Sequence, residues 1–233
     1  MVSYGAVLLA FVAGAYAQVP CQPRPVCNLD ELAKCQSSFD ITLGINAALN
    51  ISQYAQLQDS IEGVIAAAGA PGVGGLDQVC GALRQFKTCF TDPRDYDRCM
   101  FNPLGLVGDS KCQPTGISEQ QARGFVRLYS SLDFACGFGF SHFYNAEDQH
   151  PGCMTGTFKD KIAVLHQCQD EFDNQGAQNP SQQCTFVSQS TSCFRRAFQS
   201  CGEQGSWFGC EFQRMGLQAA YGNCGQEYCK FGL

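Results

Sequence analysis

The chain has 233 residues and a net charge of −6, with 15 Lys and Arg against 21 Asp and Glu. Its densest basic cluster is the pair Arg195-Arg196, so the sequence offers no positive surface for a nucleic acid or an anionic lipid, and we expect neither as a partner. No stretch after residue 17 approaches eighteen consecutive apolar residues, so we expect no transmembrane segment in the mature chain.

Residues 1–17 have the pattern of a secretory signal peptide. An apolar run over residues 6–13 precedes the small residues Ala15 and Ala17, which form a cleavage site, and a polar mature chain begins at Gln18. The run is too short to span a bilayer, which favours a cleaved signal over an uncleaved anchor. We therefore predict a secreted, extracellular protein with a cysteine-rich domain over residues 18–233.

All 16 cysteines lie in the predicted mature chain, and an even number in an oxidising compartment predicts eight disulfides. None of them forms a C-x-x-C motif, so zinc-ribbon, redox and haem-attachment sites have no basis, and we expect neither a metal nor a cofactor. The spacing leaves the pairing open. The predicted disulfide cysteines are Cys21, Cys27, Cys35, Cys80, Cys89, Cys99, Cys112, Cys136, Cys153, Cys168, Cys184, Cys193, Cys201, Cys210, Cys224 and Cys229.

Apolar residues recur at helical spacing along most of the chain, and alternating strand patterns are scarce. After a Pro-rich arm over residues 18–27, Asn28 and Glu31 form a capping pattern before an apolar series at 32–68, which is one helix or two separated near Asn50. The remaining pattern predicts, in chain order, a flexible connection at 69–75, a helix at 76–90 and an irregular segment at 91–117. Ser118 then opens a helix, with Gln121 as its capping-box partner, and a loop follows at 137–153. The last predicted elements are a helix at 155–172, a polar loop at 173–183, a helix that Ser181 caps and Gly202 ends, and a final helix at 207–219. We therefore predict an all-α fold, a helical bundle held together by disulfides.

One sequence pattern occurs twice. Cys80-x8-Cys89-Phe90 matches Cys184-x8-Cys193-Phe194, and each copy lies inside a predicted helix. Two related halves, residues 18–136 (the first half) and 153–233 (the second half), are therefore an alternative to a single domain.

The spacing of Cys184 and Cys193 constrains their partners. Nine residues of helix separate their Cα atoms by roughly 13.5 Å and place them on opposite faces, whereas a disulfide needs Cα atoms within about 7 Å. We therefore expect each cysteine to bond a different neighbour, which suits a central helix.

The segment SHFYNAEDQH, which starts at Ser141, holds the best candidates for acid–base or metal chemistry: His142, Glu147, Asp148 and His150. A solvated loop is the simpler interpretation, because no ligand spacing rule is met. Residues 139–143 miss the last glycine of a nucleophile elbow and follow no predicted strand. His166 lies between apolar neighbours and is interpreted as structural. We therefore predict no catalytic residues, and a protein that is not an enzyme.

Two further features bear on binding. Asn50-Ile51-Ser52 is a glycosylation sequon, so Asn50 is a candidate glycan site. Phenylalanine is abundant, with 18 residues. An apolar pocket between helices and simple core packing are the two interpretations of the set Phe186, Phe194, Phe198, Phe208 and Phe212.

The spacing of Cys136-Gly137, Cys153, Cys168, Cys184, Cys193, Cys201-Gly202, Trp207, Cys210, Tyr221, Cys224 and Cys229 resembles that of secreted cysteine-rich helical domains of unknown function in nematodes and other invertebrates. The resemblance covers residues 136–229 and, less closely, 27–112. It implies extracellular residence without established catalysis. We therefore predict a non-enzymatic matrix, mucosal or binding component whose partner is an extracellular protein; the alternative is a carrier of a small apolar ligand in a Phe-lined cavity.

Overall fold

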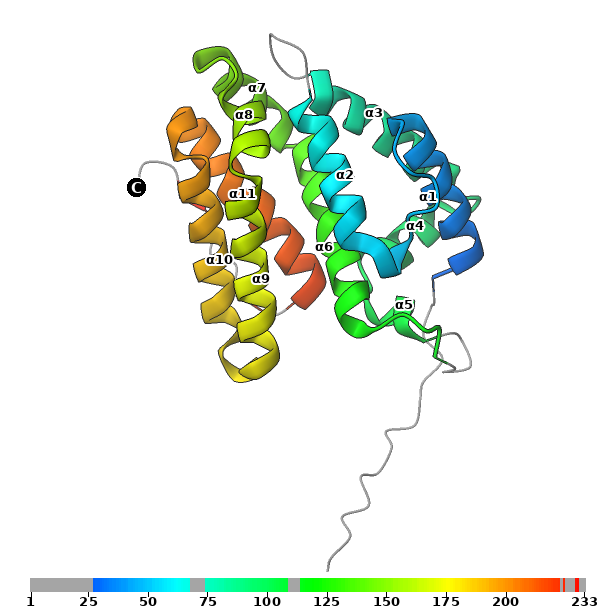
Figure 1. The fold of residues 1–233 in the computed structure, drawn as a ribbon. Coiled ribbons are helices and arrows are strands. Elements are labelled where there is room, and N and C mark those ends of the chain that lie inside the picture. The colour runs from blue at the N-terminus through cyan, green and yellow to red at the C-terminus, as the bar shows by residue number, and fades with distance from the viewer. Residues whose placement is uncertain (1–26, 68–73, 109–113, 223, 225–228, 231–233) are drawn as a thin grey trace, which may run out of the picture.

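The computed structural model describes residues 27–67, 74–108, 114–222, 224 and 229–230, and these residues form a bundle of α-helices (Figure 1). No strand occurs within these ranges, as the predicted all-α class requires. The predicted signal peptide, the Pro-rich arm up to residue 26 and the cysteines Cys21 and Cys112 lie outside the described residues. The α-helices are α1 (Leu29–Leu43), α2 (Tyr54–Ala66), α3 (Gly74–Cys89), α4 (Pro93–Met100), α5 (Leu104–Val107), α6 (Glu119–Cys136), α7 (Gly139–Gln149), α8 (Cys153–Asp160), α9 (Ile162–Gln178), α10 (Gln183–Ala197) and α11 (Gly202–Tyr221).

Two predicted helix starts are confirmed by their side-chain caps. The Asn28 side chain accepts a hydrogen bond from the backbone N–H of Glu31 at 3.3 Å, and Ser118 forms a reciprocal capping box with Gln121. The apolar series at 32–68 forms two helices, because Gly44 ends α1 with a φ of 71° that favours glycine.

Several predicted loops are helical, and the reason differs between them. The segment 91–117 contains α4 and α5; Asp92 caps α4 and Pro93 occupies its first position, where proline fits a helix. The segment 137–153 contains α7, and the polar residues 173–178 continue α9. Ser181 lies in a short 3-10 helix, η2 (Pro180–Gln182), so α10 begins without a side-chain cap. Gly202 begins α11.

Fourteen cysteines form seven disulfides in the described residues, and none of these fourteen is free. The pairs are Cys27–Cys99, Cys35–Cys89, Cys80–Cys136, Cys153–Cys201, Cys168–Cys193, Cys184–Cys224 and Cys210–Cys229. Every pair lies within one of the two halves. If Cys210 and Cys229 are set aside, six cysteines in each half pair in the same order: first with fifth, second with fourth, third with sixth.

The helices pack in an order that runs from one half to the other. α1 packs on α3 and α3 on α6; α6 then packs on α11, α11 on α10, and α10 on α9. Figure 1 shows α6 and α11 in the middle of this arrangement, with α9 and α10 at one side. Cys193 bonds α9 and Cys184 bonds the segment after α11, so the two cysteines do have different partners. α10 is not the central helix, however. It packs on a neighbour at each side, but it buries fewer of its residues than α6 and α11 do, so α6 and α11 are the central helices.

The surface where the two halves meet, which we call the seam, combines close packing with polar contacts. Gly216 of α11 lies so close to α6 that an added Cβ would meet Ser131 and the backbone of Arg127. The Ser131 hydroxyl donates to the carbonyl of Phe212 at 2.9 Å.

No helix in the described part of the chain combines the length and apolarity needed to cross a membrane.

Candidate functional site

An apolar groove of about 480 Å³ opens in the first half. α1 forms one wall, the segment Ala47–Ser52 forms the second, and residues 115–117 with Phe125 of α6 close the groove. Most of its lining is aliphatic, and its volume falls within the range of small-molecule sites. The full lining is Leu29, Leu32, Ala33, Gln36, Ala47, Ala48, Leu49, Asn50, Ile51, Ser52, Thr115, Gly116, Ile117 and Phe125.

The segment after α1 shapes the groove because local hydrogen bonds fold it back. The N–H of Gly44 bonds the carbonyl of Ile41, and the N–H of Ile45 bonds that of Asp40. The Asn46 side chain then accepts from the N–H of Ala48 at 3.1 Å. These turns hold Ala47–Ser52 opposite α1 and leave the groove between them.

One polar network lies at the inner side of the groove. Gln36, which is 3% exposed, donates to Asp40 over 2.7 Å and accepts from the hydroxyl of Tyr129. The other carboxyl oxygen of Asp40 has no hydrogen-bond partner. Burial raises the pKa of Asp40 to about 7, while the Gln36 hydrogen bond opposes that rise. The groove therefore has an amide within a wall that is otherwise mainly apolar.

Asn50 lies exposed at the edge of this groove. Its side-chain oxygen accepts from the N–H of Ser52 at 3.0 Å and caps the 3-10 helix η1 (Ile51–Gln53). Asn50 and Ser52 are both exposed, so the acceptor side chain of the sequon is accessible with respect to the described residues.

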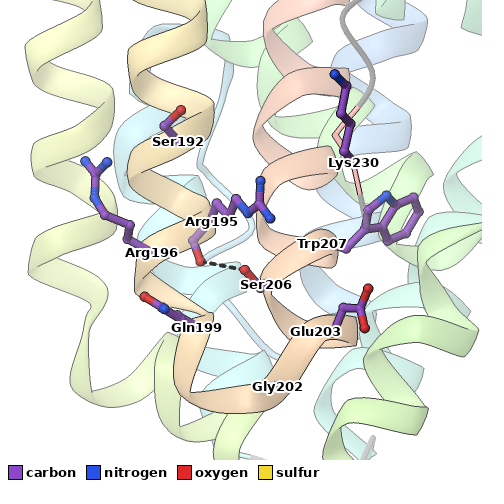
Figure 2. Close-up of a pocket in the computed structure, with 9 residues that line it drawn as sticks. All are labelled: Ser192, Arg195, Arg196, Gln199, Gly202, Glu203, Ser206, Trp207 and Lys230. Carbon is purple, nitrogen blue, oxygen red and sulfur yellow. Dashed lines mark hydrogen bonds between the residues drawn. The ribbon is translucent and has the colours of Figure 1, made fainter. Parts of the chain in front are cut away.

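A second cleft, of about 550 Å³, lies between α10 and α11 and is polar (Figure 2). Figure 2 shows Arg195 reaching from α10 toward α11, whereas Arg196 extends to the other side of α10. Glu203, a carboxylate, lines the same cleft from the start of α11. Because its cations diverge and an acid accompanies them, this cleft makes a weaker candidate site than the apolar groove.

The acid–base candidates of the sequence do not assemble a site. Glu147 is buried and accepts from the N–H groups of Gly152 at 2.7 Å and Met154 at 2.8 Å, so it anchors the start of α8. His142 bonds the side chain of Gln204, and its ring lies 4.1 Å from that of Trp207. Asp148 and His150 are exposed. The predicted solvated loop is wrong, because α7 includes His142, Glu147 and Asp148.

Of the two interpretations of the phenylalanine set, core packing describes these side chains. Phe194, Phe198, Phe208 and Phe212 are buried against one another, with ring centroids 5.7 Å to 6.4 Å apart in the pairs Phe194–Phe212, Phe198–Phe208 and Phe208–Phe212. Phe186 packs with Phe172 and Leu217. Phe212 also borders a small cavity with a volume of about 10 Å³. These side chains form core, as the alternative interpretation holds.

His166, which the sequence interprets as structural, contacts two carboxylates of another helix. Its Nε2 lies 2.7 Å from Glu62 Oε2 and 3.5 Å from Asp59 Oδ1, across the seam between α9 and α2. No sequence spacing signals this cluster, because residue 166 is more than a hundred positions from residue 62.

The sequence contains a second repeated motif. Cys35-Gln36-Ser37-Ser38-Phe39-Asp40 and Cys168-Gln169-Asp170-Glu171-Phe172-Asp173 both have the form C-Q-x-x-F-D. Of the six helices in the packing order, only the two at its ends, α1 and α9, contain this motif. This motif marks the buried glutamine beside the groove, which cysteine spacing alone does not indicate.

Comparison of the chain with protein-family models, with curated proteins and with solved structures finds no match.

Proposed function

We propose that this protein is a secreted, non-enzymatic binding protein that carries a small, mainly apolar ligand in the groove of the first half. The observation that carries the proposal is the groove itself, which has about 480 Å³ of space, an aliphatic lining and a buried amide at Gln36. A site of this kind selects a ligand by apolar burial and orients it through its few polar groups. The fourteen cysteines in disulfides suit an oxidising compartment.

The ligand that fits this groove has an apolar body and one polar group. The aliphatic side chains of α1 and of Ala47–Ile51 contact the body, and the gain comes from removing apolar surface from water. The Gln36 amide donates one of its two N–H bonds to Asp40, and its second N–H suits a ligand oxygen. A hydroxyl or a carboxyl group at one end of a short chain meets both conditions.

Two measurements test the carrier function. Native protein, extracted with organic solvent, should release one small apolar molecule per chain, which mass spectrometry detects. The delipidated protein should bind dansylaminoundecanoic acid and raise its fluorescence. Ala48→Phe fills the groove from an exposed position and should weaken probe binding by about tenfold or more, which corresponds to about 1.4 kcal/mol. A blank extract together with no probe binding would contradict the proposal.

A matched variant controls for the added aromatic ring. Ala163 is exposed on α9 and lies outside the groove, so Ala163→Phe adds the same side chain to another surface. It should leave probe binding unchanged. Equal effects of the two variants would place the probe elsewhere on the surface.

We further propose that Asn50 carries a glycan at the edge of the groove. Its exposed position at the cap of η1 supports this modification. Treatment of the secreted protein with a peptide N-glycosidase should lower its mass, and Asn50→Gln should abolish that shift. The role as a matrix or mucosal component remains a prediction from the sequence.

A further inference from the structure

We propose that Asp59, Glu62 and His166 bind one divalent transition-metal ion of the zinc type, which ties α2 of the first half to α9 of the second. Asp59 and Glu62 lie one turn apart on α2 and face His166 on α9. One ligand atom from each residue lies within 4.8 Å of the other two. This is the only such group of three potential ligands among the described residues.

Two of the three distances are close to those that one ion requires. Nitrogen and oxygen ligands lie about 2.0–2.2 Å from zinc, so two tetrahedral ligands are roughly 3.4 Å apart. His166 Nε2 is 3.5 Å from Asp59 Oδ1 and 2.7 Å from Glu62 Oε2. The ion replaces the hydrogen bond between His166 and Glu62, and a widening of less than an ångström gives both atoms coordination distance.

Buried amides already hold the innermost ligand in place. Glu62 is 3% exposed, and its Oε1 accepts from Gln58 Nε2 at 2.8 Å. Gln58 Nε2 also donates to Gln169 Oε1 at 2.7 Å, on the other side of the seam. With Oε1 held in this way, Oε2 points to His166. Such outer hydrogen bonds are what orients the ligands of metal sites.

Charge favours a cation at this place. The two carboxylates carry two negative charges, one of them on the buried Glu62, and Asp170 adds a third nearby on α9. A buried carboxylate requires a compensating charge or hydrogen bonds, and the side chains that contact Glu62 are the amide of Gln58 and the imidazole of His166. A divalent ion balances the pair of carboxylates.

The mixture of donors selects the type of ion. Calcium and magnesium prefer all-oxygen sites, whereas one imidazole with two carboxylates suits zinc. The side chain of Asp59 is 61% exposed, so solvent reaches the site and water can complete the coordination. This arrangement resembles a bridge between two surfaces more than an enclosed catalytic pocket.

The location gives the bridge its consequence. Each of the seven described disulfides joins two cysteines of the same half, so none of them crosses the seam. An ion held by Asp59, Glu62 and His166 adds coordinate bonds between the halves at that seam. Its binding energy then stabilises their association.

The test uses the full protein after chelator treatment and dialysis. Zinc titrated by calorimetry should bind with one ion per chain at micromolar affinity, and cobalt should produce visible absorption bands of a site with one nitrogen ligand. Zinc should also raise the unfolding temperature. His166→Gln and Asp59→Asn should each weaken zinc binding by about tenfold to a hundredfold. Asp59 is exposed, so this variant changes the site without disturbing the core.

Asp170→Asn is the matched control, because it removes a neighbouring carboxylate that is not one of the three ligands. It should retain zinc affinity to within about threefold, since it loses only a screened charge. Absence of zinc binding, or zinc binding that neither His166→Gln nor Asp59→Asn weakens, would overturn the proposal and leave a simple hydrogen-bonded ion pair.

Discussion

The first half and the second half share a disulfide pattern but differ in what lies inside it. In each half, six cysteines pair first with fifth, second with fourth and third with sixth. The second and third of these cysteines are 45 residues apart in the first half, at Cys35 and Cys80, but 16 apart in the second half, at Cys168 and Cys184. The longer interval contains segment 47–52, which lines the groove, and α2.

This difference indicates where binding capacity lies. The shared cysteines hold three helices in each half, α1, α3 and α6 or α9, α10 and α11. The residues that line one wall of the groove and the two carboxylates of the proposed metal site belong to the longer interval. The two halves thus share a disulfide pairing order, and the extra segment accounts for their different surfaces.

The two C-Q-x-x-F-D motifs show the same contrast at the level of one carboxylate. Asp40 is fully buried within the first half, and its hydrogen-bond partner is the neutral Gln36. Asp173 instead crosses the seam and pairs with Arg127, whose side chain is 4% exposed, at 3.0 Å. One copy is therefore a buried carboxyl without a cation, and the other forms an ion pair between the halves.

Removal of the ion pair at the seam should give the largest effect. Asp173→Asn leaves the buried guanidinium of Arg127 without its counter-charge, so we expect a loss of about 3 kcal/mol in the free energy of unfolding. Urea denaturation at neutral pH measures it. A loss below about 1 kcal/mol, the range of exposed pairs, would show that Arg127 does not depend on Asp173.

Close packing at the seam should give the next largest effect. Gly216→Ala places a Cβ against Ser131 and Arg127 of α6, and overpacking of this kind costs about 1–3 kcal/mol. The control is Gly63→Ala on α2, where an added Cβ meets nothing within 4 Å. The control should be neutral or stabilising, because alanine favours a helix. Equal stabilities would contradict the close approach of α6 and α11.

Removal of the Asp40 carboxylate should change the free energy of unfolding in the opposite direction. The pKa of Asp40 is about 7 in the folded chain and near 4 in an unfolded chain. Between these pH values the folded chain retains a proton that the unfolded chain has lost, so the stability contributed by Asp40 falls as pH rises from about 4 to 7. Asp40→Asn removes this dependence and should stabilise the protein at pH 8, with little change at pH 4.

Thermal unfolding of the wild type and of Asp40→Asn across this pH range checks the sign. Asp173→Asn serves as the matched variant of the equivalent position, and it should destabilise where Asp40→Asn stabilises. Parallel pH profiles for the wild type and Asp40→Asn would show that Asp40 does not titrate in this window.

Loss of the side-chain cap at the start of α6 should have the smallest effect on the free energy of unfolding. α6 has the capping box of Ser118 and Gln121, whereas α11 begins without a side-chain cap. Ser118→Ala should cost about 1 kcal/mol, because it removes one partner of the N-terminal N–H groups. Urea denaturation measures this loss, and Ser118→Asn should restore most of it. A full loss in Ser118→Asn would contradict a capping role.

The sequence supports the helix class and most of the helix centres, because apolar periodicity and caps are local signals. Asn28 and Ser118 are examples in which the residue type alone identifies the helix start. The prediction of irregular segments at 91–117 and 137–153 is wrong, because Pro93, Gly139 and the polar residues of α7 resemble loop residues. Burial of Phe143 and Ala146 and the anchoring role of Glu147 depend on contacts with later helices.

The candidate sites were largely beyond the reach of local patterns. The groove depends on how segment 47–52 folds back on α1, and the ligand cluster joins α2 with α9. The sequence does not determine the direction in which the chain turns after α1, and residues 62 and 166 are far apart in sequence. The phenylalanines of the second half were easier to notice, but an aromatic residue in a pocket and one in a core have the same sequence pattern.

The confinement of the disulfides to each half determines how the chain responds to a protease. Cys21 and Cys112 also belong to the first half by position, so residues 137–152 are the only stretch of backbone that connects the halves covalently. A single cut between Cys35 and Cys89 leaves fragments linked by sulfur, whereas a cut in α7 leaves two pieces that separate on a non-reducing gel. Of the helices in the described ranges, α7 is thus the one whose cleavage converts a single covalent molecule into two.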